Sequence, residues 1–180
     1  SIFRDAENFI VDNGKTDHEG IELSLNWLIS SNNTISSNIT YGDHRYDFET
    51  DTSMREKIRI GNKIDTSPKL MANLIWDLNL RNDSSISFEI EHMSSYYTDA
   101  ANLHEYDGHT LYHARFNKNL STSMKGFVRV DNIFDKAYAE RADFNAFGGD
   151  RYFPGLPREF YVGIESVSYT HLTLPTKCWG

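Results

Sequence analysis

The sequence has few of the residues that cross-link a chain or interrupt its secondary structure. Its single cysteine, Cys178, excludes a disulfide framework and any zinc site built from several cysteines. Four prolines and eleven glycines in 180 residues are too few for a collagen-like or disordered chain, and 13% aromatic residues are too many. Positive charge is also scarce, because 18 Lys and Arg stand against 26 Asp and Glu, for a net charge of −8. We therefore expect no nucleic-acid partner, since such partners select basic surfaces.

Long hydrophobic runs are absent as well. The longest apolar stretches hold only a few residues, such as Trp27-Leu28-Ile29, far short of the ~18 that a membrane-spanning helix needs. The mean hydropathy is accordingly low, at −0.56. A transmembrane β-barrel has the same low average, because each strand turns only every second side chain toward lipid.

The sequence does contain alternation with a period of two. From Gly20 to Ile29 every second residue is apolar, and the residues between them are mostly polar. The same pattern recurs in residues 70–80 and 86–90, where a helix would place acidic residues inside its apolar stripe. Weaker copies complete a set of about eight candidate strands: Phe9 with Val11, 35–41, 112–116, 126–130 and 160–164. No segment predicts a helix, so the chain is predicted to be all-β and antiparallel.

The connections between these strands alternate in length. Short polar turns at 30–33, 81–84 and 119–122 are interleaved with long segments at 49–67, 97–109 and 139–156. Short turns on one rim and long loops on the other are typical of an outer-membrane barrel, whereas a β-sandwich gives no reason for this segregation. The pattern favours a transmembrane β-barrel, with a β-sandwich binding module as the alternative. Aromatic residues are expected to form the interfacial girdle of such a barrel: Trp27, Trp76, Tyr41, Tyr96 and Tyr97.

Two motifs near the end of the chain are more specific. Residues 128–138 run from an apolar strand into Asn-Ile-Phe-Asp-Lys-Ala-Tyr, and residues 154–164 join Pro-Gly-Leu-Pro-Arg to a last strand. Together with Asn13-Gly14-Lys15 followed by Gly20-Ile21-Glu22-Leu23, they resemble motifs of TonB-dependent outer-membrane receptors. We interpret the signature positions as structural, because their polar groups can bond backbone atoms at a strand end and their prolines shape a tight turn: Asn132, Phe134, Asp135, Lys136, Tyr138, Pro154, Gly155, Pro157, Arg158 and Phe160.

The resemblance implies a location in the bacterial outer membrane and a 22-stranded barrel occluded by an N-terminal plug. Residues 1–165 would supply about the last eight strands, while the plug and its energy-coupling box lie outside this sequence. Because the alternation breaks after Ile164 and Pro175 would interrupt a strand, residues 166–180 are expected to be a non-native tail of translated vector or adaptor sequence. The implied function is active transport of a scarce nutrient, most often a ferric siderophore or similar metal chelate. The implied partners are the TonB energy-transducing complex, outer-membrane lipid and lipopolysaccharide.

Ligand-binding residues are expected in the long outer loops. The 139–156 loop combines cationic and aromatic groups that suit an anionic or aromatic chelate: Arg141, Phe144, Phe147, Arg151 and Tyr152. The 49–67 loop holds a second basic cluster, formed by Arg55, Lys57 and Arg59. The alternative for both clusters is contact with lipopolysaccharide or simple hydration.

The sequence offers no recognisable catalytic or metal-binding motif. It has no Gly-x-Ser-x-Gly elbow and no serine placed beside a histidine and a carboxylate in a known order, so we predict no enzyme and no cofactor. His104, Glu105 and Asp107 could gather around a metal, but a solvated outer loop is the favoured interpretation. His109 and His113 would lie ~13 Å apart on a strand, too far to share one ion.

A small, closed eight-stranded barrel with a structural or adhesion role is the alternative to the receptor. The inward positions argue against it, because they are mostly acidic or amide without an obvious complement of Arg and Lys: Glu22, Asn26, Asp77, Glu89 and Glu91. A wide, water-filled barrel tolerates that imbalance better than a narrow, packed one.

Overall fold

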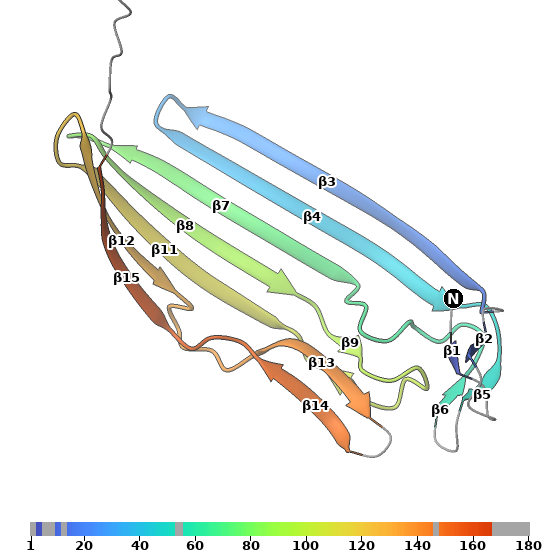
Figure 1. Cartoon of the computed structure of the whole chain (residues 1–180). Helices are drawn as coiled ribbons and strands as arrows, with labels where there is room; N and C mark the ends of the chain where they lie inside the picture. Colours follow the sequence, from blue (N-terminus) through green and yellow to red (C-terminus); the bar gives the residue numbers. More distant parts are fainter. Residues whose placement is uncertain (1–2, 5–9, 12–13, 53–55, 146–147, 167–180) are drawn as a thin grey trace, which may run out of the picture.

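The computed structural model describes residues 3–4, 10–11, 14–52, 56–145 and 148–166. Within these residues there is no helix long and apolar enough to cross a membrane. The architecture is all-β and antiparallel, as predicted, and it is dominated by one curved sheet of long strands (Figure 1).

Seven strands form this sheet in the described part of the chain, in the order β15-β12-β11-β8-β7-β4-β3. Their bounds are β3 Thr16–Ser30, β4 Asn33–Tyr46, β7 Leu70–Leu80, β8 Ser84–Met93, β11 His109–Asn119, β12 Met124–Asp131 and β15 Glu159–Ser166. Each pairs with its neighbour along the chain, with a longer excursion between β12 and β15.

The sequence predicts about eight strands, whereas the sheet of the described residues has seven, and the two numbers differ because of the start of the chain. Ile10–Val11 forms β2, which pairs with β1 (Phe3–Arg4) in a separate small hairpin instead of joining the sheet, and Phe9 lies outside the described residues. β3 and β15 are the two edges of the sheet and are not paired with each other. The alternative of a closed eight-stranded barrel is therefore wrong for the described residues.

The two ends of the sheet differ as the loop lengths predicted. One end, which we call the turn end, consists of the short connections at 31–32, 81–83 and 120–123. Asn82 and Asp83 both have positive φ, which their short polar side chains tolerate, and this makes the tight β7–β8 turn possible. The other end, the loop end, carries the long connections, and Figure 1 shows them gathered opposite the turns.

The long connections contain small hairpins of their own. β5 (Thr50–Thr52) pairs with β6 (Glu56–Ile58), β9 (Tyr96–Tyr97) with β10 (Glu105–Tyr106), and β13 (Ala139–Asn145) with β14 (Gly149–Pro154). The buried hydrophobic cluster of the described residues lies here, in Tyr96, Tyr106, Ala139 and Ala142, and it touches the sheet through Met93 at the loop end of β8. A β-sandwich would bury one sheet face, so the position of this cluster excludes the sandwich alternative.

The registers turn the predicted alternation into two distinct faces. One row crosses all seven strands with an apolar side chain at every step: Trp27, Ile35, Trp76, Phe88, Ala114, Val130 and Phe160. The neighbouring row on the opposite face runs through Leu28, Thr34, Asp77, Ser87, Arg115, Arg129 and Tyr161. Phe160 and Val162 on the apolar face are 69% and 78% exposed, which suits a surface that faces lipid. We call the apolar face the outer face and the polar face the inner face.

Candidate functional site

The β13–β14 hairpin is held in place by two tyrosines that reach it from the preceding loop. The Tyr96 hydroxyl accepts the Ala142 amide at 2.7 Å and donates to the Ala142 carbonyl at 3.2 Å. Tyr106 does the same for Ala139, at 3.0 and 3.2 Å. The girdle prediction is therefore wrong for Tyr96, whose side chain is buried inside the loops, and Tyr97 lies on β9 outside the main sheet.

This hairpin brings together the predicted basic residues of the 139–156 loop. Arg141 Nη2 donates to Asp143 Oδ2 at 2.8 Å, and Arg151 Nε donates to Asp143 Oδ1 at 2.6 Å. Asp143 is 6% exposed, whereas the two arginine side chains are 63% and 50% exposed. One buried carboxylate thus orients two guanidinium groups that remain accessible, and the trio carries a net positive charge.

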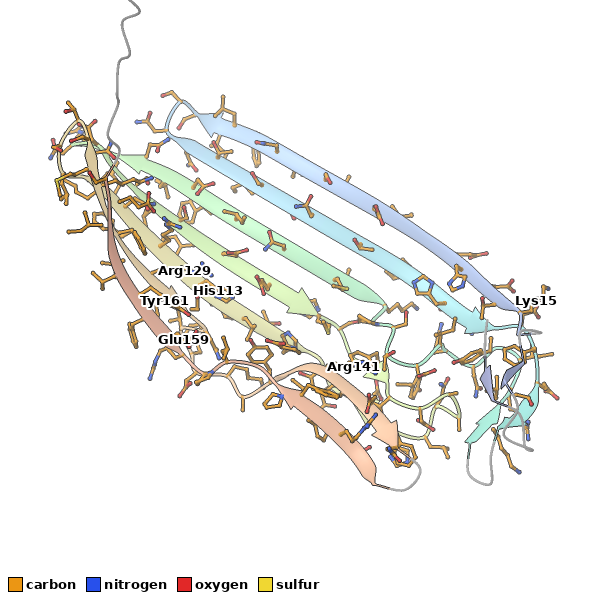
Figure 2. The ribbon with its side chains drawn as sticks, in the orientation of Figure 1. Lys15, His113, Arg129, Arg141, Glu159 and Tyr161 are labelled. Atoms are coloured by element: carbon orange, nitrogen blue, oxygen red, sulfur yellow. The ribbon has the colours of Figure 1, made fainter. Side chains whose placement is uncertain are left out.

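Aromatic groups flank the arginine pair. Phe144 stacks on His104 with ring centroids 4.0 Å apart, and His104 Nδ1 lies 3.3 Å from Asp150 Oδ1. Tyr152 is exposed, with its ring 6.3 Å from that of Tyr106. Phe147 lies outside the described residues. The arrangement presents cations and π-faces together on one hairpin at the loop end, where Figure 2 labels Arg141.

The second predicted basic cluster lies elsewhere. Lys57 is exposed on β6, and Arg59, just after β6, donates to the Ile58 carbonyl at 3.1 Å. Arg55 lies outside the described residues. Figure 1 draws the β5–β6 and β13–β14 hairpins well apart, so the structure does not bring the two predicted clusters into one site.

The signature residues after β12 form a compact set of side-chain hydrogen bonds to the backbone. Asn132 is buried with φ of 50°, donates to the carbonyls of Lys136 at 3.0 Å and Leu156 at 3.2 Å, and accepts the Lys136 amide at 2.9 Å. Asp135 accepts the Arg158 amide at 2.9 Å. These bonds tie the chain leaving β12 to the chain entering β15, which is why both residues are polar and short.

The remaining signature residues pack around these hydrogen bonds. The Gly155 amide donates to the Tyr138 carbonyl at 3.0 Å, and the Tyr138 ring occupies the space that a side chain at Gly155 would need. Phe134 is exposed and meets Tyr112 edge-on at 5.1 Å. Pro154 ends β14, and Pro157 and Arg158 lead into β15, where Phe160 joins the outer face.

The inner face of β11, β12 and β15 carries a charged cluster that sequence reasoning missed. Asp131 Oδ1 accepts from Arg129 Nε at 2.7 Å and lies 3.2 Å from His113 Nδ1. Tyr161 donates to Glu159 at 2.5 Å. Figure 2 shows His113, Arg129, Tyr161 and Glu159 close together, and a cavity of about 530 Å³ opens between them and the loop at 132–157.

Comparison with known proteins decides the family of this barrel wall. The family model described as "TonB dependent receptor-like, beta-barrel" matches residues 2–133. The chain belongs to this family. No curated protein sequence matches it at a significant level.

Solved structures agree with this receptor barrel fold. The siderophore receptor PiuA from Acinetobacter baumannii superimposes with a TM-score of 0.78 over 92% of this chain, at 18% identity. The ferric yersiniabactin uptake receptor FyuA from Yersinia pestis gives a TM-score of 0.69 over 87%, also at 18% identity. The ferric citrate transporter FecA gives 0.71 over 86%, at 22% identity. The chain covers 24%, 24% and 25% of these three proteins, so it spans about a quarter of their length.

Family membership places the receptor barrel in the Gram-negative outer membrane and fixes how its two faces are used. The outer face meets lipid, and the inner face lines the lumen. The lumen wall corrects one expectation, because Arg115 and Arg129 lie on it beside the acidic residues; alternation alone could have placed them there. The wall of the receptor is therefore of mixed charge and not purely acidic.

The receptor's loop at 104–107 does not assemble a metal site from His104, Glu105 and Asp107. No group of three or more His, Cys, Asp or Glu side chains suitable for a metal occurs among the residues that the structure describes. His104 is engaged with Phe144 and Asp150, and Glu105 pairs with Tyr97 across the β9–β10 hairpin. β15 reaches Ser166, and the rest of the expected tail, 167–180, lies outside the described residues.

Proposed function

We propose that the complete protein is an active-transport receptor that imports a ferric siderophore or a similar metal chelate, energised through TonB. The family supports this proposal, and so do the activities named for similar folds: siderophore reception, ferric yersiniabactin uptake and ferric citrate transport. Energy coupling would act through a plug supplied by another part of the protein. Lipid and lipopolysaccharide would surround the outer face and its aromatic residues.

The observation that carries the proposal is the Arg141–Asp143–Arg151 trio on β13 and β14. A buried carboxylate holds both guanidinium groups in fixed positions, so their exposed edges can bind an anionic chelate with little loss of side-chain entropy. Tyr152 and the Phe144–His104 stack add aromatic surface for a catecholate or other planar group. We assign Lys57 and Arg59 to a secondary basic surface, with Arg55 and Phe147 as further contacts.

The proposal has no catalytic step. Binding at the loop end is the chemistry that the exposed groups can perform, and the compared proteins are named as receptors and transporters. Assays with lipid ester and peptide substrates are expected to show no turnover, and turnover that survives purification would overturn the non-enzymatic assignment.

Uptake tests the function of the whole protein. Cells expressing the full gene should accumulate ⁵⁵Fe from ferric citrate or from a ferric catecholate, and uptake should collapse when proton-motive force is removed. The transport proposal would be refuted if none of the tested chelates is taken up, or if uptake continues after proton-motive force is removed.

Variants test the binding site separately. Removing both arginines alone would strand a buried carboxylate, so the informative variant combines Arg141→Gln, Arg151→Gln and Asp143→Asn. We expect binding of the transported chelate to weaken by about tenfold or more, because two charge-assisted contacts are lost. Tyr152→Ala provides a second variant that leaves the trio intact. Arg81→Ala, an exposed arginine at the turn end, is the matched control and should bind normally. Normal affinity in both site variants would refute the site while leaving the transport proposal standing.

A further inference from the structure

Two histidines face each other across the β3–β4 pair, away from every site described above. His18 and His44 are directly opposite in the register, and their Nδ1 atoms are 2.9 Å apart with ring centroids separated by 4.9 Å. His18 lies an even number of residues from Glu22, and His44 an even number from Thr40, so both histidines are on the inner face with those residues. Figure 2 labels Lys15, three residues before His18, at the loop end of these strands.

The surrounding residues orient both imidazole rings. His18 Nε2 lies 2.9 Å from the Thr16 hydroxyl oxygen, which can accept its proton and leave Nδ1 with a lone pair. His44 folds back over Gly42, where a Cβ would lie only 2.5 Å from His44 Nε2. Each Nε2 is bonded or packed away from the pair, so the two Nδ1 atoms face each other.

We propose that His18 and His44 form a bidentate binding site for a divalent transition metal of the Cu(II) or Ni(II) type. With metal–nitrogen bonds of about 2.0–2.1 Å, two nitrogens at a right angle around a metal lie about 2.9 Å apart, whereas a tetrahedral angle needs about 3.3–3.4 Å. The observed 2.9 Å separation matches the right angle of a tetragonal site. The two rings already lie at this separation through their hydrogen bond, so a tetragonal ion such as Cu(II) or Ni(II) needs no change in the distance between the nitrogens, whereas a tetrahedral ion needs them to move apart.

The oxygen partner of His18 strengthens the assignment. Histidines that bind metals usually donate their second ring N–H to an oxygen, which fixes the tautomer and the ring orientation, and Thr16 is placed to do this. In the metal-free pair, His44 donates its Nδ1–H to His18 Nδ1, because the His18 proton lies on Nε2 toward Thr16. When the metal binds both Nδ1 atoms, the His44 proton moves through solvent to its own Nε2, so both ligands are neutral imidazoles and no net proton is lost. His18 is exposed, so the remaining coordination positions are open to water or to a ligand from the lumen.

Cu(II) binding to the full-length receptor in detergent tests this site. We expect one Cu(II) per chain in calorimetry and a paramagnetic resonance spectrum with splitting from two nitrogens. His18→Asn and His44→Asn should each weaken binding by more than about 100-fold, and Thr16→Val by about 10- to 100-fold, since it removes only the orienting oxygen. His92→Asn, which alters a histidine of β8 whose Nδ1 lies 2.9 Å from the Thr110 hydroxyl oxygen, is the matched control and should bind Cu(II) normally.

Two results would overturn the inference: wild-type Cu(II) affinity in the His18→Asn/His44→Asn double variant, or an equal loss of affinity in His92→Asn. The paramagnetic resonance spectrum distinguishes the proposed effect from misfolding. If Thr16→Val is folded, its bound Cu(II) should still show splitting from two nitrogens although its affinity is lower. Ferric chelate uptake measured on the same variants separates this site from the proposed transport function, which does not require it.

Discussion

The Tyr96 hydroxyl stands beside Ala142 in the position that a neighbouring strand's peptide group would occupy. It accepts the Ala142 amide proton at 2.7 Å and donates its own proton to the Ala142 carbonyl at 3.2 Å. Both residues are buried, so neither backbone group has water as a ready substitute. The orientation of β13, and with it the Arg141–Asp143–Arg151 trio, therefore depends on a side chain 46 residues earlier in the chain.

Replacing Tyr96 by Phe should loosen the β13–β14 hairpin without unfolding the barrel wall. The change leaves the Ala142 N–H and C=O buried and unpaired, at a cost of about 1–3 kcal/mol in local stability. Amide hydrogen exchange should show faster exchange at Ala142 and unchanged exchange in β8 and β11. Tyr112→Phe, on the outer face, is the control, and unaltered exchange at Ala142 in Tyr96→Phe would contradict the bonding described.

The same tyrosine predicts an alkaline limit for the outer loops. Burial raises the pKa of Tyr96 above its ordinary value of 10.0, and burial likewise raises the pKa of Tyr138. Below about pH 10 both are neutral in the folded and unfolded states, so their contribution to stability is fully present. As pH rises from about 10 through the folded pKa values, the unfolded chain loses its protons first, and the free energy of unfolding falls. Proteolysis of the loops should accelerate in this range, and less steeply in Tyr96→Phe.

Much of the fold follows from alternation alone. Period two assigns Trp27, Trp76 and Phe160 to one face and Asp77 to the other, because successive side chains of a strand point to opposite faces. The same rule also puts Arg115 and Arg129 on the inner face, but the predicted inward set did not include them, because the strands that contain them alternate weakly. The predicted strand near Phe9 does not join the sheet, and the sequence could not show this because two apolar residues do not reveal which partner they pair with.

Contacts between distant loops are beyond this kind of prediction. The hairpin brings Arg141 and Arg151 together because β13 pairs with β14 within one loop, while their role in ligand binding stays a prediction. The sequence does not show that Asp143 binds both arginines from a buried position, because its burial depends on packing against other loops. The sequence predicts a girdle position for Tyr96 because an aromatic residue near a strand end has the same local pattern in a girdle and in a loop core. The His18–His44 pair depends on the register of β3 against β4, which the two-residue turn fixes and composition does not.

Gly155→Ala should destabilise the approach to β15. The new Cβ would lie 2.0 Å from the Tyr138 ring, which itself packs on His109 at 4.7 Å and so has little room to retreat. Overpacking of this kind costs about 1–3 kcal/mol. Urea unfolding of the full-length receptor should report the loss, and a second substitution, Tyr138→Ser, should recover part of it by making room. Gly148→Ala is the control, because a Cβ at Gly148 meets nothing within 4 Å. Equal destabilisation by the two alanines would argue against the clash.

Asp131→Asn tests the mixed-charge lumen wall. The carboxylate accepts from Arg129 and contacts His113 in a partly enclosed position, with 17% of its side chain exposed. An amide of the same shape keeps the volume but removes the charge that both partners contact, at a cost of about 1.5–3 kcal/mol for hydrogen bonds to a charged group. Glu165→Gln is the matched control, because Glu165 is 55% exposed and lies 3.7 Å from Arg115, a geometry worth less than about 1 kcal/mol. Urea unfolding of the full-length receptor should therefore separate the two variants clearly, and equal midpoints would show that the inner cluster is solvated and does not hold β11 to β12.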